Sequence, residues 1–308
     1  MSRAFATRIE RFRSQPRIRA GSLITTVFGD AILPRGGRIW LGSLIRLLEP
    51  LGLNDRLVRT SVFRLAKEEW LYADACGRKS DYVLTRVGQR RFEEASRQIY
   101  ALRSPHWDRH WRLIVAVGDF EARQRDRLRQ SLFWQGFGSI AGDCFVHPSA
   151  DLRGVFDTLA AEGLGELLPQ LMPLVTVEIP PGSGDTERGL VRRAWNLDAL
   201  GDAYDEFIAA CRPLERELSR MSRIDDEQAF LVRILLIHDY RRLLLRDPEL
   251  PDVLLPGDWP GHRARQLCAE LYRRLLEPSE RHLDRHLLLA SGATPVAGGR
   301  LAARFSEN

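Results

Sequence analysis

One continuous stretch of the chain, residues 52–85, constrains the fold most strongly, because a turn, an amphipathic helix and two short strands follow one another in it. Asn54 suits the N-cap of this helix, and Asp55 suits the positive end of the helix dipole. Apolar and small side chains then recur at helical spacing, which predicts one buried face. The residues expected on that face are Leu57, Val58, Ser61, Val62 and Leu65.

The two strands after this helix form a predicted hairpin with a basic tip. Trp70 and Leu71 end the helix and begin the first strand, residues 76–80 form the tip, and residues 81–85 return as the second strand. This order is typical of a winged helix-turn-helix, whose helix enters the major groove of DNA while the hairpin reaches the flanking backbone. The alternative is a small helical domain whose charged face is only solvated.

The opposite face of the predicted helix carries side chains of the kind that DNA recognition uses. Arginine binds guanine O6 and N7 in a bidentate way, threonine meets a phosphate or a thymine methyl group, and cations at a hairpin tip contact phosphates or the minor groove. For any single arginine, a solvated side chain or an internal ion pair is the alternative. The predicted DNA-binding residues are Arg56, Arg59, Thr60 and Arg64 of the helix, with Phe63 on the same face, and Arg78 and Lys79 of the tip.

The distribution of charge agrees with this interpretation. Residues 1–104 carry 20 Lys and Arg against 10 Asp and Glu, whereas residues 105–308 carry 26 against 31. The basic excess therefore lies in the segment with the DNA-binding pattern. Cations concentrated in this way attract polyanions and make their binding dependent on salt.

Composition limits the class of protein. At 308 residues with 44% hydrophobic content, the chain is long enough for two or three domains. Its first residues lack the apolar core of a signal peptide, and no apolar run reaches the roughly 18 residues of a membrane helix. The four cysteines are far apart, without a CxxC pair, which favours reduced thiols over a disulfide framework or a zinc site. We therefore expect a soluble, cytoplasmic protein without membrane contact.

A first domain is predicted over residues 17–104. Residues 1–16 have the composition of a loose basic arm, and residues 22–33 predict a first helix. Residues 38–41 predict a short strand that pairs with the hairpin. The other helices expected in this domain are residues 43–48 and 86–102.

Two further domains are predicted after it. Residues 105–182 have the β-α-β-β-α-β order of a small ferredoxin-like domain, with its last strand at residues 174–179 and its second helix at residues 151–168. Residues 188–300 are helical by their pattern. The three helices expected there are residues 197–211, 226–245 and 261–276, separated in part by a proline-rich loop.

Three segments carry a family resemblance: LVRTSVFRLAKEEWL at residues 57–71, WRLIVAV at residues 111–117 and IHDYRRLLLRDPELPDVLLPGDWPG at residues 237–261. Together they resemble the phenylacetic acid catabolism repressor (PaaX) family of bacterial regulators. The resemblance implies an α+β multidomain fold with a winged helix-turn-helix, a ferredoxin-like middle domain and an all-α C-terminal domain. It also implies a homodimeric repressor that binds a palindromic operator of double-stranded DNA in an aromatic-acid operon and dissociates when phenylacetyl-coenzyme A accumulates. One departure is Glu69, where a glycine is expected at the turn.

An acyl-coenzyme A effector requires cationic groups for its phosphates and an apolar slot for its acyl end. The family-like C-terminal segment supplies side chains of both kinds. The alternative is that the tryptophan and the prolines of this segment only clamp a loop on the helical core. The predicted effector-binding residues are His238, Tyr240, Arg241, Arg242 and Trp259.

The main enzymatic alternative is a metal-dependent nuclease, because the middle domain also resembles small CRISPR-associated ferredoxin-like nucleases. Asp119 follows the first strand of that domain, where an acidic residue paired across a dimer would hold magnesium. The other interpretation of Asp119 is a solvated residue or a cap of the next helix. Two His-x3-His pairs, His106 with His110 and His282 with His286, lack a close third ligand. We therefore predict no catalytic residues, no metal ligands and no cofactor.

Overall fold

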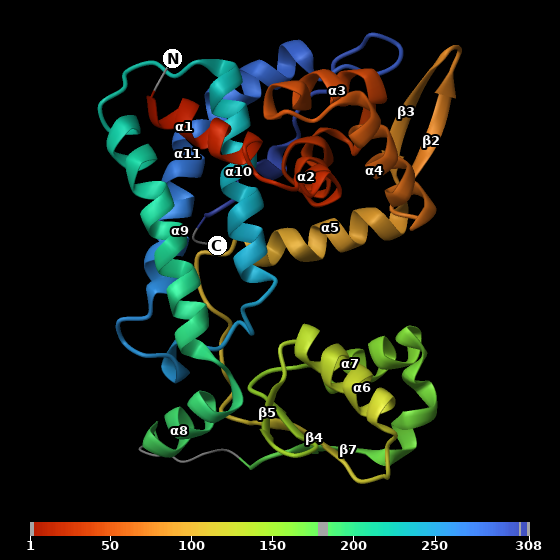
Figure 1. Ribbon diagram of the computed structural model, residues 1–308, viewed down its shortest axis with the longest axis vertical. Coiled ribbons are helices and arrows are strands. Elements are labelled where there is room, and N and C mark those ends of the chain that lie inside the picture. The colour runs from red at the N-terminus through yellow and green to blue at the C-terminus, as the bar shows by residue number, and fades with distance from the viewer. Residues whose placement is uncertain (1–2, 178–183, 302, 307–308) are drawn as a thin grey trace. The chain divides into compact units, whose positions relative to one another are not determined.

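Two units make up the polypeptide in this computed structural model, and each combines segments that are distant in the sequence (Figure 1). The first unit comprises Met1–Leu102, Glu206–Arg242 and His262–Asn308, and the second comprises Arg103–Asp205 and Leu243–Gly261. Residues 3–177, 184–301 and 303–306 are described by the structure. The division into three domains inferred from the sequence stays a prediction.

The fold is mixed α and β, and among the described residues from α8 onward the regular elements are helices. None of the described helices is long and apolar enough to cross a membrane. The helices are α1 (Arg3–Arg13), α2 (Ala20–Val27), α3 (Leu41–Leu48), α4 (Asp55–Lys67), α5 (Arg86–Ile99), α6 (Ala122–Trp134), α7 (Leu152–Leu159), α8 (Gly184–Ala194), α9 (Leu197–Leu218), α10 (Asp226–Leu244) and α11 (Pro260–His286). The strands are β1 (Arg38–Trp40), β2 (Leu71–Cys76), β3 (Lys79–Leu84), β4 (Arg112–Ala116), β5 (Gly138–Ala141), β6 (Cys144–His147) and β7 (Leu171–Val175).

A three-stranded antiparallel sheet of order β1-β3-β2 follows the predicted pattern. β2 and β3 pair from Leu71 opposite Leu84 to Cys76 opposite Lys79, so that Gly77 and Arg78 alone make the turn. Gly77 has a φ of 60°, the left-handed conformation that tight hairpin turns require. The predicted strand at residues 38–41 is confirmed, because β1 pairs with β3.

The helix of the DNA-binding pattern is α4, and Asn54 caps it by accepting a hydrogen bond from the amide of Leu57 at 2.9 Å. The buried face is confirmed for the residues from Val58 to Leu65 that were expected there, but it is wrong for Leu57, which is 39% exposed. At 100° per residue, Leu57 lies about a quarter of a turn from the centre of that face. Just after the end of α4, Glu69 has a φ of 61°, the left-handed conformation that favours the glycine expected there.

The N-terminal segment corrects the sequence-based expectation. Residues 1–16 were expected to form a loose arm, but Arg3–Arg13 form helix α1. Phe5, Ile9 and Phe12 recur at helical spacing and are buried. This short apolar stripe stabilises the helix by packing, in spite of the arginines between its members.

A buried charged cluster lies in the core of the first unit, around Asp30 in the π-helical turn after α2. Arg233 of α10 and Arg304 each place a nitrogen 2.9 Å from an oxygen of this carboxylate, and the hydroxyls of Tyr100 and Tyr272 donate to it at 2.6 and 3.1 Å. Burial would raise the pKa of Asp30, but the two guanidinium groups and the hydroxyls hold it below its ordinary value. The cluster joins segments that are up to 274 residues apart.

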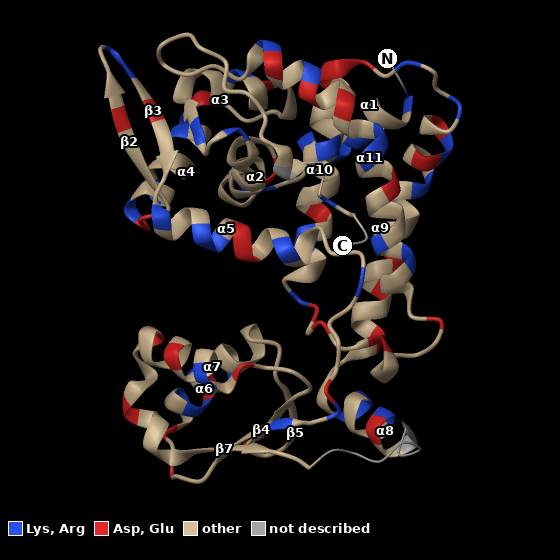
Figure 2. Cartoon of the chain, turned by 180° about the vertical axis from the view of Figure 1, so that it is seen from behind, with Lys and Arg blue, Asp and Glu red and all other residues tan. Residues whose placement is uncertain are grey.

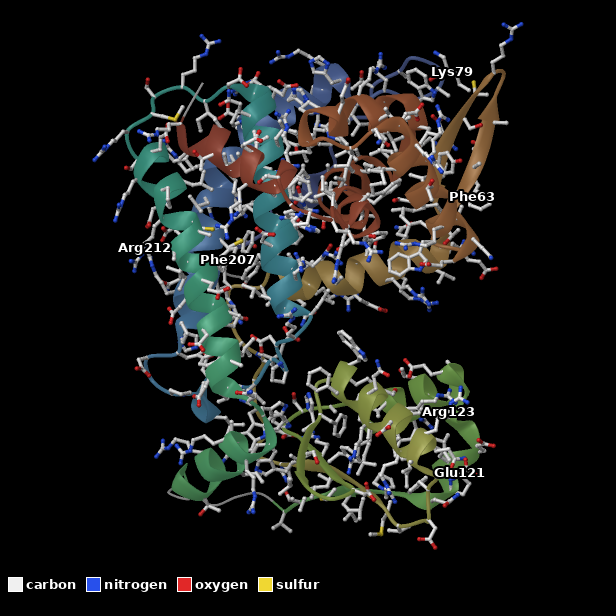
Figure 3. All side chains as sticks on the ribbon, viewed as in Figure 1. Phe63, Lys79, Glu121, Arg123, Phe207 and Arg212 are labelled. Atoms are coloured by element: carbon white, nitrogen blue, oxygen red, sulfur yellow. The ribbon has the colours of Figure 1, made fainter. Side chains whose placement is uncertain are left out.

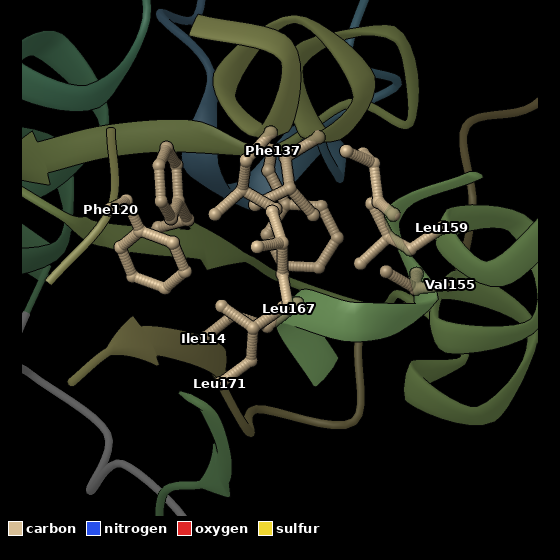
Figure 4. Close-up of a cluster of buried hydrophobic side chains, with 11 residues drawn as sticks. Ile114, Phe120, Phe137, Val155, Leu159, Leu167 and Leu171 are labelled. Atoms are coloured by element: carbon tan, nitrogen blue, oxygen red, sulfur yellow. The ribbon is translucent and has the colours of Figure 1, made fainter. Parts of the chain in front are cut away.

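The second unit contains an antiparallel sheet of order β5-β6-β4-β7, with α6 and α7 following β4 and β6 along the chain. Ile114, Phe145 and Leu171 of the strands pack with side chains of both helices in one apolar core (Figure 4). The last strand begins earlier than the predicted residues 174–179, which in part lie outside the described residues. Pro173 obscured its start in the sequence, yet it is tolerated there because β7 is an edge strand. The predicted helix 151–168 is also shorter, since α7 ends at Leu159 and π- and 3-10-helical turns follow.

Candidate nucleic-acid interface

The solvent-exposed face of α4 gathers basic, hydroxyl and apolar side chains. Phe63 is 69% exposed, an unusual position for a phenylalanine on an otherwise charged helix surface. Figure 3 shows Phe63 and Lys79 on the side of the β2–β3 hairpin, and Figure 2 shows basic residues on α4 and at the hairpin tip. The exposed residues of this face are Arg56, Leu57, Arg59, Thr60, Phe63, Arg64 and Lys67.

Two of the predicted arginines on this face have acidic neighbours one helical turn away. Arg59 Nε lies 2.6 Å from Asp55 Oδ1, and Arg64 Nε lies 3.7 Å from Glu68 Oε1. All four side chains are more than half exposed, so these pairs contribute little to stability and exchange readily for a phosphate or a base. The hydroxyl of Thr60 donates to the Arg56 carbonyl at 2.8 Å.

The hairpin tip presents two cations in different environments. Arg78 is exposed in the two-residue turn. The Lys79 ammonium lies 4.4 Å from the ring centroid of Trp40, and the Arg46 guanidinium lies 5.0 Å from the same ring. These cation–π contacts hold Lys79 near the N-terminus of α3, and its side chain stays exposed.

Residues after α11 support the sheet and α3, which the sequence did not indicate. Trp40 donates its amide to the Leu288 carbonyl at 3.0 Å. The Ser43 hydroxyl donates to the His286 carbonyl at 2.7 Å and accepts from the Leu288 amide at 2.9 Å. These bonds join positions 243 or more residues apart, and no local pattern encodes them.

The residues predicted to bind an effector lie in both units. His238 is buried, its Nδ1 lies 3.1 Å from the Thr26 hydroxyl, and burial lowers its pKa to about 4. Tyr240 is buried with its ring 5.6 Å from that of Phe207. The other three are Arg241, which donates to the carbonyl and hydroxyl of Ser22, Arg242, which is half-buried, and Trp259 of the second unit, which packs edge-on against Tyr204.

Three of these side chains, His238, Tyr240 and Arg241 of α10, contact other residues of the first unit. The His238 ring lies within hydrogen-bond distance of the Thr26 hydroxyl, and Arg241 donates to Ser22. The Tyr240 ring packs against that of Phe207. This arrangement packs α10 against α2 and α9 within the first unit. The role of the set toward a ligand stays a prediction.

Comparison with known protein families covers most of the chain. Residues 19–88 match the model described as PaaX-like protein, residues 104–169 match the PaaX protein central Cas2-like domain, and residues 195–285 match the PaaX-like protein C-terminal domain. The chain belongs to the PaaX family. The transcriptional repressor PaaX of Escherichia coli strain K12 is 37% identical over 285 residues, which are 92% of this chain and 89% of that protein.

A similarity search among solved structures finds an uncharacterized protein from Mycobacterium tuberculosis. It is 21% identical, and the match covers 78% of this chain and 89% of that one with a TM-score of 0.49.

Asp119, the residue on which the nuclease alternative depends, lies in the second unit within the segment that matches the Cas2-like model. Asp119 is exposed between β4 and α6, and the α6 cap is instead made by Glu121, whose side chain accepts from the third residue of the helix. His282 and His286 have ring centroids 4.5 Å apart, whereas His110 bonds the Asp108 carbonyl. Within the described part of the chain, no group of three His, Cys, Asp or Glu side chains is arranged to hold a metal ion.

Proposed function

We propose that this chain is a transcriptional repressor that binds the operator of an aromatic-acid (phenylacetate) degradation operon and leaves it when an aryl-acetyl-coenzyme A, such as phenylacetyl-coenzyme A, binds. The observation that carries the proposal is the exposed face of α4 beside a hairpin with a basic tip, in a chain that belongs to the PaaX family. The 37% identity to a transcriptional repressor supports the same role. A protein with this role acts in the cytoplasm, where the chromosome lies.

The DNA-binding part of this proposal is a winged helix-turn-helix within residues 17–104. In it, α4 is the recognition helix, α3 is the preceding helix and β2 with β3 is the wing. Their order along the chain and the β1-β3-β2 sheet support this interpretation. Arg56, Arg59 and Arg64 would contact bases or phosphates.

Phe63 adds an apolar contact to this recognition surface. Its ring is exposed between Arg59 and Lys67, one helical turn from each. Apolar side chains in the major groove contact the thymine methyl group, which is the apolar feature that distinguishes A·T pairs there. We therefore include Phe63 among the residues that read the operator.

Two copies of the chain would bind one operator. The antiparallel order β5-β6-β4-β7 supports a ferredoxin-like domain over residues 105–182, and we propose that this domain holds the two protomers together. Two recognition helices at a fixed separation require a palindromic operator. An effector releases the DNA only if it binds more tightly to a conformation of the dimer in which the distance between the two recognition helices does not match the operator.

The proposal is tested by fluorescence anisotropy on labelled DNA from upstream of the operon that encodes the chain. We expect tight binding over competitor DNA, and release by phenylacetyl-coenzyme A but not by phenylacetate or coenzyme A. Binding no tighter than to competitor DNA at moderate salt would contradict the repressor function. Operator binding that the thioester leaves unchanged would contradict the effector.

A further inference from the structure

A pocket of about 810 Å³ opens in the first unit, lined by α3, the connection before α10, the first turn of α10 and the end of α11. Its volume lies within the range of roughly 300–1,000 Å³ that is usual for small-molecule sites. It is distinct from the set His238–Arg242, none of which lines it.

Two of the three carboxylates in this pocket are already engaged. Asp225 Oδ1 accepts from the amide of Gln228 at 2.9 Å and so caps α10. Asp226 accepts from Arg281 at 2.9 Å and also from Arg285. These contacts neutralise Asp226 and Arg285 against each other, so neither dominates the field of the pocket.

The pocket also presents hydrogen-bond donors that a ligand could use. Arg46 and Arg223 are exposed at the pocket, where the carboxylates of Asp225 and Glu227 oppose their charge. The imidazoles of His282 and His286 face each other from one side of α11. The guanidinium groups can bind phosphate or carboxylate oxygens through charge-assisted hydrogen bonds, and a neutral imidazole can donate an ordinary one.

His282 is a largely buried side chain that lines the pocket. It is only 7% exposed, and its ring stacks on Phe230 with centroids 5.3 Å apart. Burial and the neighbouring His286 lower its pKa to about 4, so it is neutral at pH 7. Because His282 lines the pocket, its imidazole can hydrogen-bond a ligand that binds there.

Apolar side chains complete the lining. Leu47, Met221, Ile224 and Leu288 contribute hydrocarbon surface to the same pocket. We propose that this pocket binds an organic anion with an apolar part and that, if the proposed function holds, the anion is the acyl-coenzyme A effector. The cations and imidazoles hold its phosphates or thioester carbonyl, and the apolar side chains hold part of its hydrocarbon.

Residues that line the pocket, or follow it closely in the sequence, are hydrogen-bonded to α3 and to the hairpin. The carbonyl of His286 and the amide of Leu288 are both bonded to the Ser43 hydroxyl at the start of α3. Four residues after His286, the Ala290 amide donates to Asp81 Oδ1 in β3 at 2.6 Å. A ligand that displaces the end of α11 would therefore change the hydrogen bonds that hold α3 and the hairpin. The ligand would then bind with different affinity to the two positions of these elements, which is the requirement for control of DNA binding.

The first test is isothermal titration calorimetry of the full chain with phenylacetyl-coenzyme A in the absence of DNA. Arg223→Ala with His286→Ala removes two exposed side chains of the pocket, and we expect the affinity for the thioester to fall at least about tenfold. Arg212→Ala, an exposed arginine of α9 outside the pocket, is the matched control and should leave the affinity unchanged.

Thioester affinity that is unchanged in the double variant would overturn the proposal, and so would a loss found only in Arg242→Ala, which tests the site predicted from the sequence. Both results leave the repressor function intact, because that function is judged by operator binding and release with the wild-type chain. A wild-type chain that binds its operator but not the thioester would overturn the pocket assignment together with the effector.

The second test separates binding from its consequence for DNA. Ser43→Ala removes the hydroxyl that joins α3 to the end of α11, but it does not line the pocket. We expect this variant to bind the thioester normally and to require about fivefold more of it for DNA release. An unchanged release midpoint in a variant with normal thermal stability would overturn the coupling.

Discussion

At the scale of single residues, the α4 arginines that we propose to contact DNA contribute little to the stability of the fold. Replacing Arg59 and Arg64 together by alanine removes two exposed ion pairs. Each good bidentate contact with guanine is worth about 1–3 kcal/mol, so we expect operator affinity to fall at least about tenfold. The free energy of unfolding should change by less than about 1 kcal/mol.

Anisotropy titrations and thermal unfolding measure these two effects. The control removes two exposed arginines elsewhere, with Arg123→Ala and Arg212→Ala. An affinity equal to that of the control would show that α4 is not the recognition helix.

His238 makes stability depend on pH. Burial lowers its pKa from the ordinary 6.5 to about 4, so the unfolded chain takes up the proton first as the pH falls. The contribution of His238 to stability is therefore complete above about pH 6.5 and is lost as the pH falls toward 4. Between pH 7.5 and pH 5 we expect a loss of about 2 kcal/mol in the free energy of unfolding from this group.

Urea unfolding at several pH values checks this expectation. Burial also lowers the pKa of His147 and His282 to about 4, so the wild-type slope is not due to His238 alone. His238→Gln should show a shallower dependence on pH than the wild type. Identical dependence in the two proteins would mean that His238 is protonated equally in the folded and unfolded states.

At the scale of elements, the β2–β3 hairpin should contribute affinity without specificity. Arg78 lies at its turn, where a guanidinium meets phosphate rather than a base edge. Arg78→Ala should weaken the binding of operator and random DNA alike. The slope of log K against log salt should become less steep by about 1, as expected for one lost phosphate contact. A loss confined to the operator would instead assign Arg78 to base recognition.

Local elements were predictable because their causes are local. The cap at Asn54 and the pairing of the hairpin strands depend on residues close in the sequence, whereas the expectation of glycine at position 69 came from the family resemblance. Helix α1 was missed although Phe5, Ile9 and Phe12 carry a helical signal, since the charge between them outweighed it. The bonds of Ser43 to the end of α11 had no signal at all, because chain segments far apart meet only in the folded unit.

At the scale of the whole molecule, the proposed dimer predicts a geometric requirement on the operator. Two recognition helices held rigidly fit half-sites that are separated by about one helical turn, ~34 Å, or a multiple of it. Inserting five base pairs between the half-sites turns one of them to the opposite face of the DNA. We expect this insertion to lower affinity at least about tenfold, and sedimentation to show two chains per intact operator. Equal affinity for both operators would contradict a rigid dimer.

The Asp30 cluster has a consequence for synthesis of the protein. A ribosome releases α2, α4 and the hairpin long before it has made the residues that complete their unit, since Arg233, Tyr272 and Arg304 all follow the central segment. Until then, Asp30 is a carboxylate without its cations, and the apolar faces around it lack their partners. We therefore expect a translation product that stops early to lack a stable first unit. If the proposed function holds, truncation would then not yield a repressor that occupies the operator and ignores its effector.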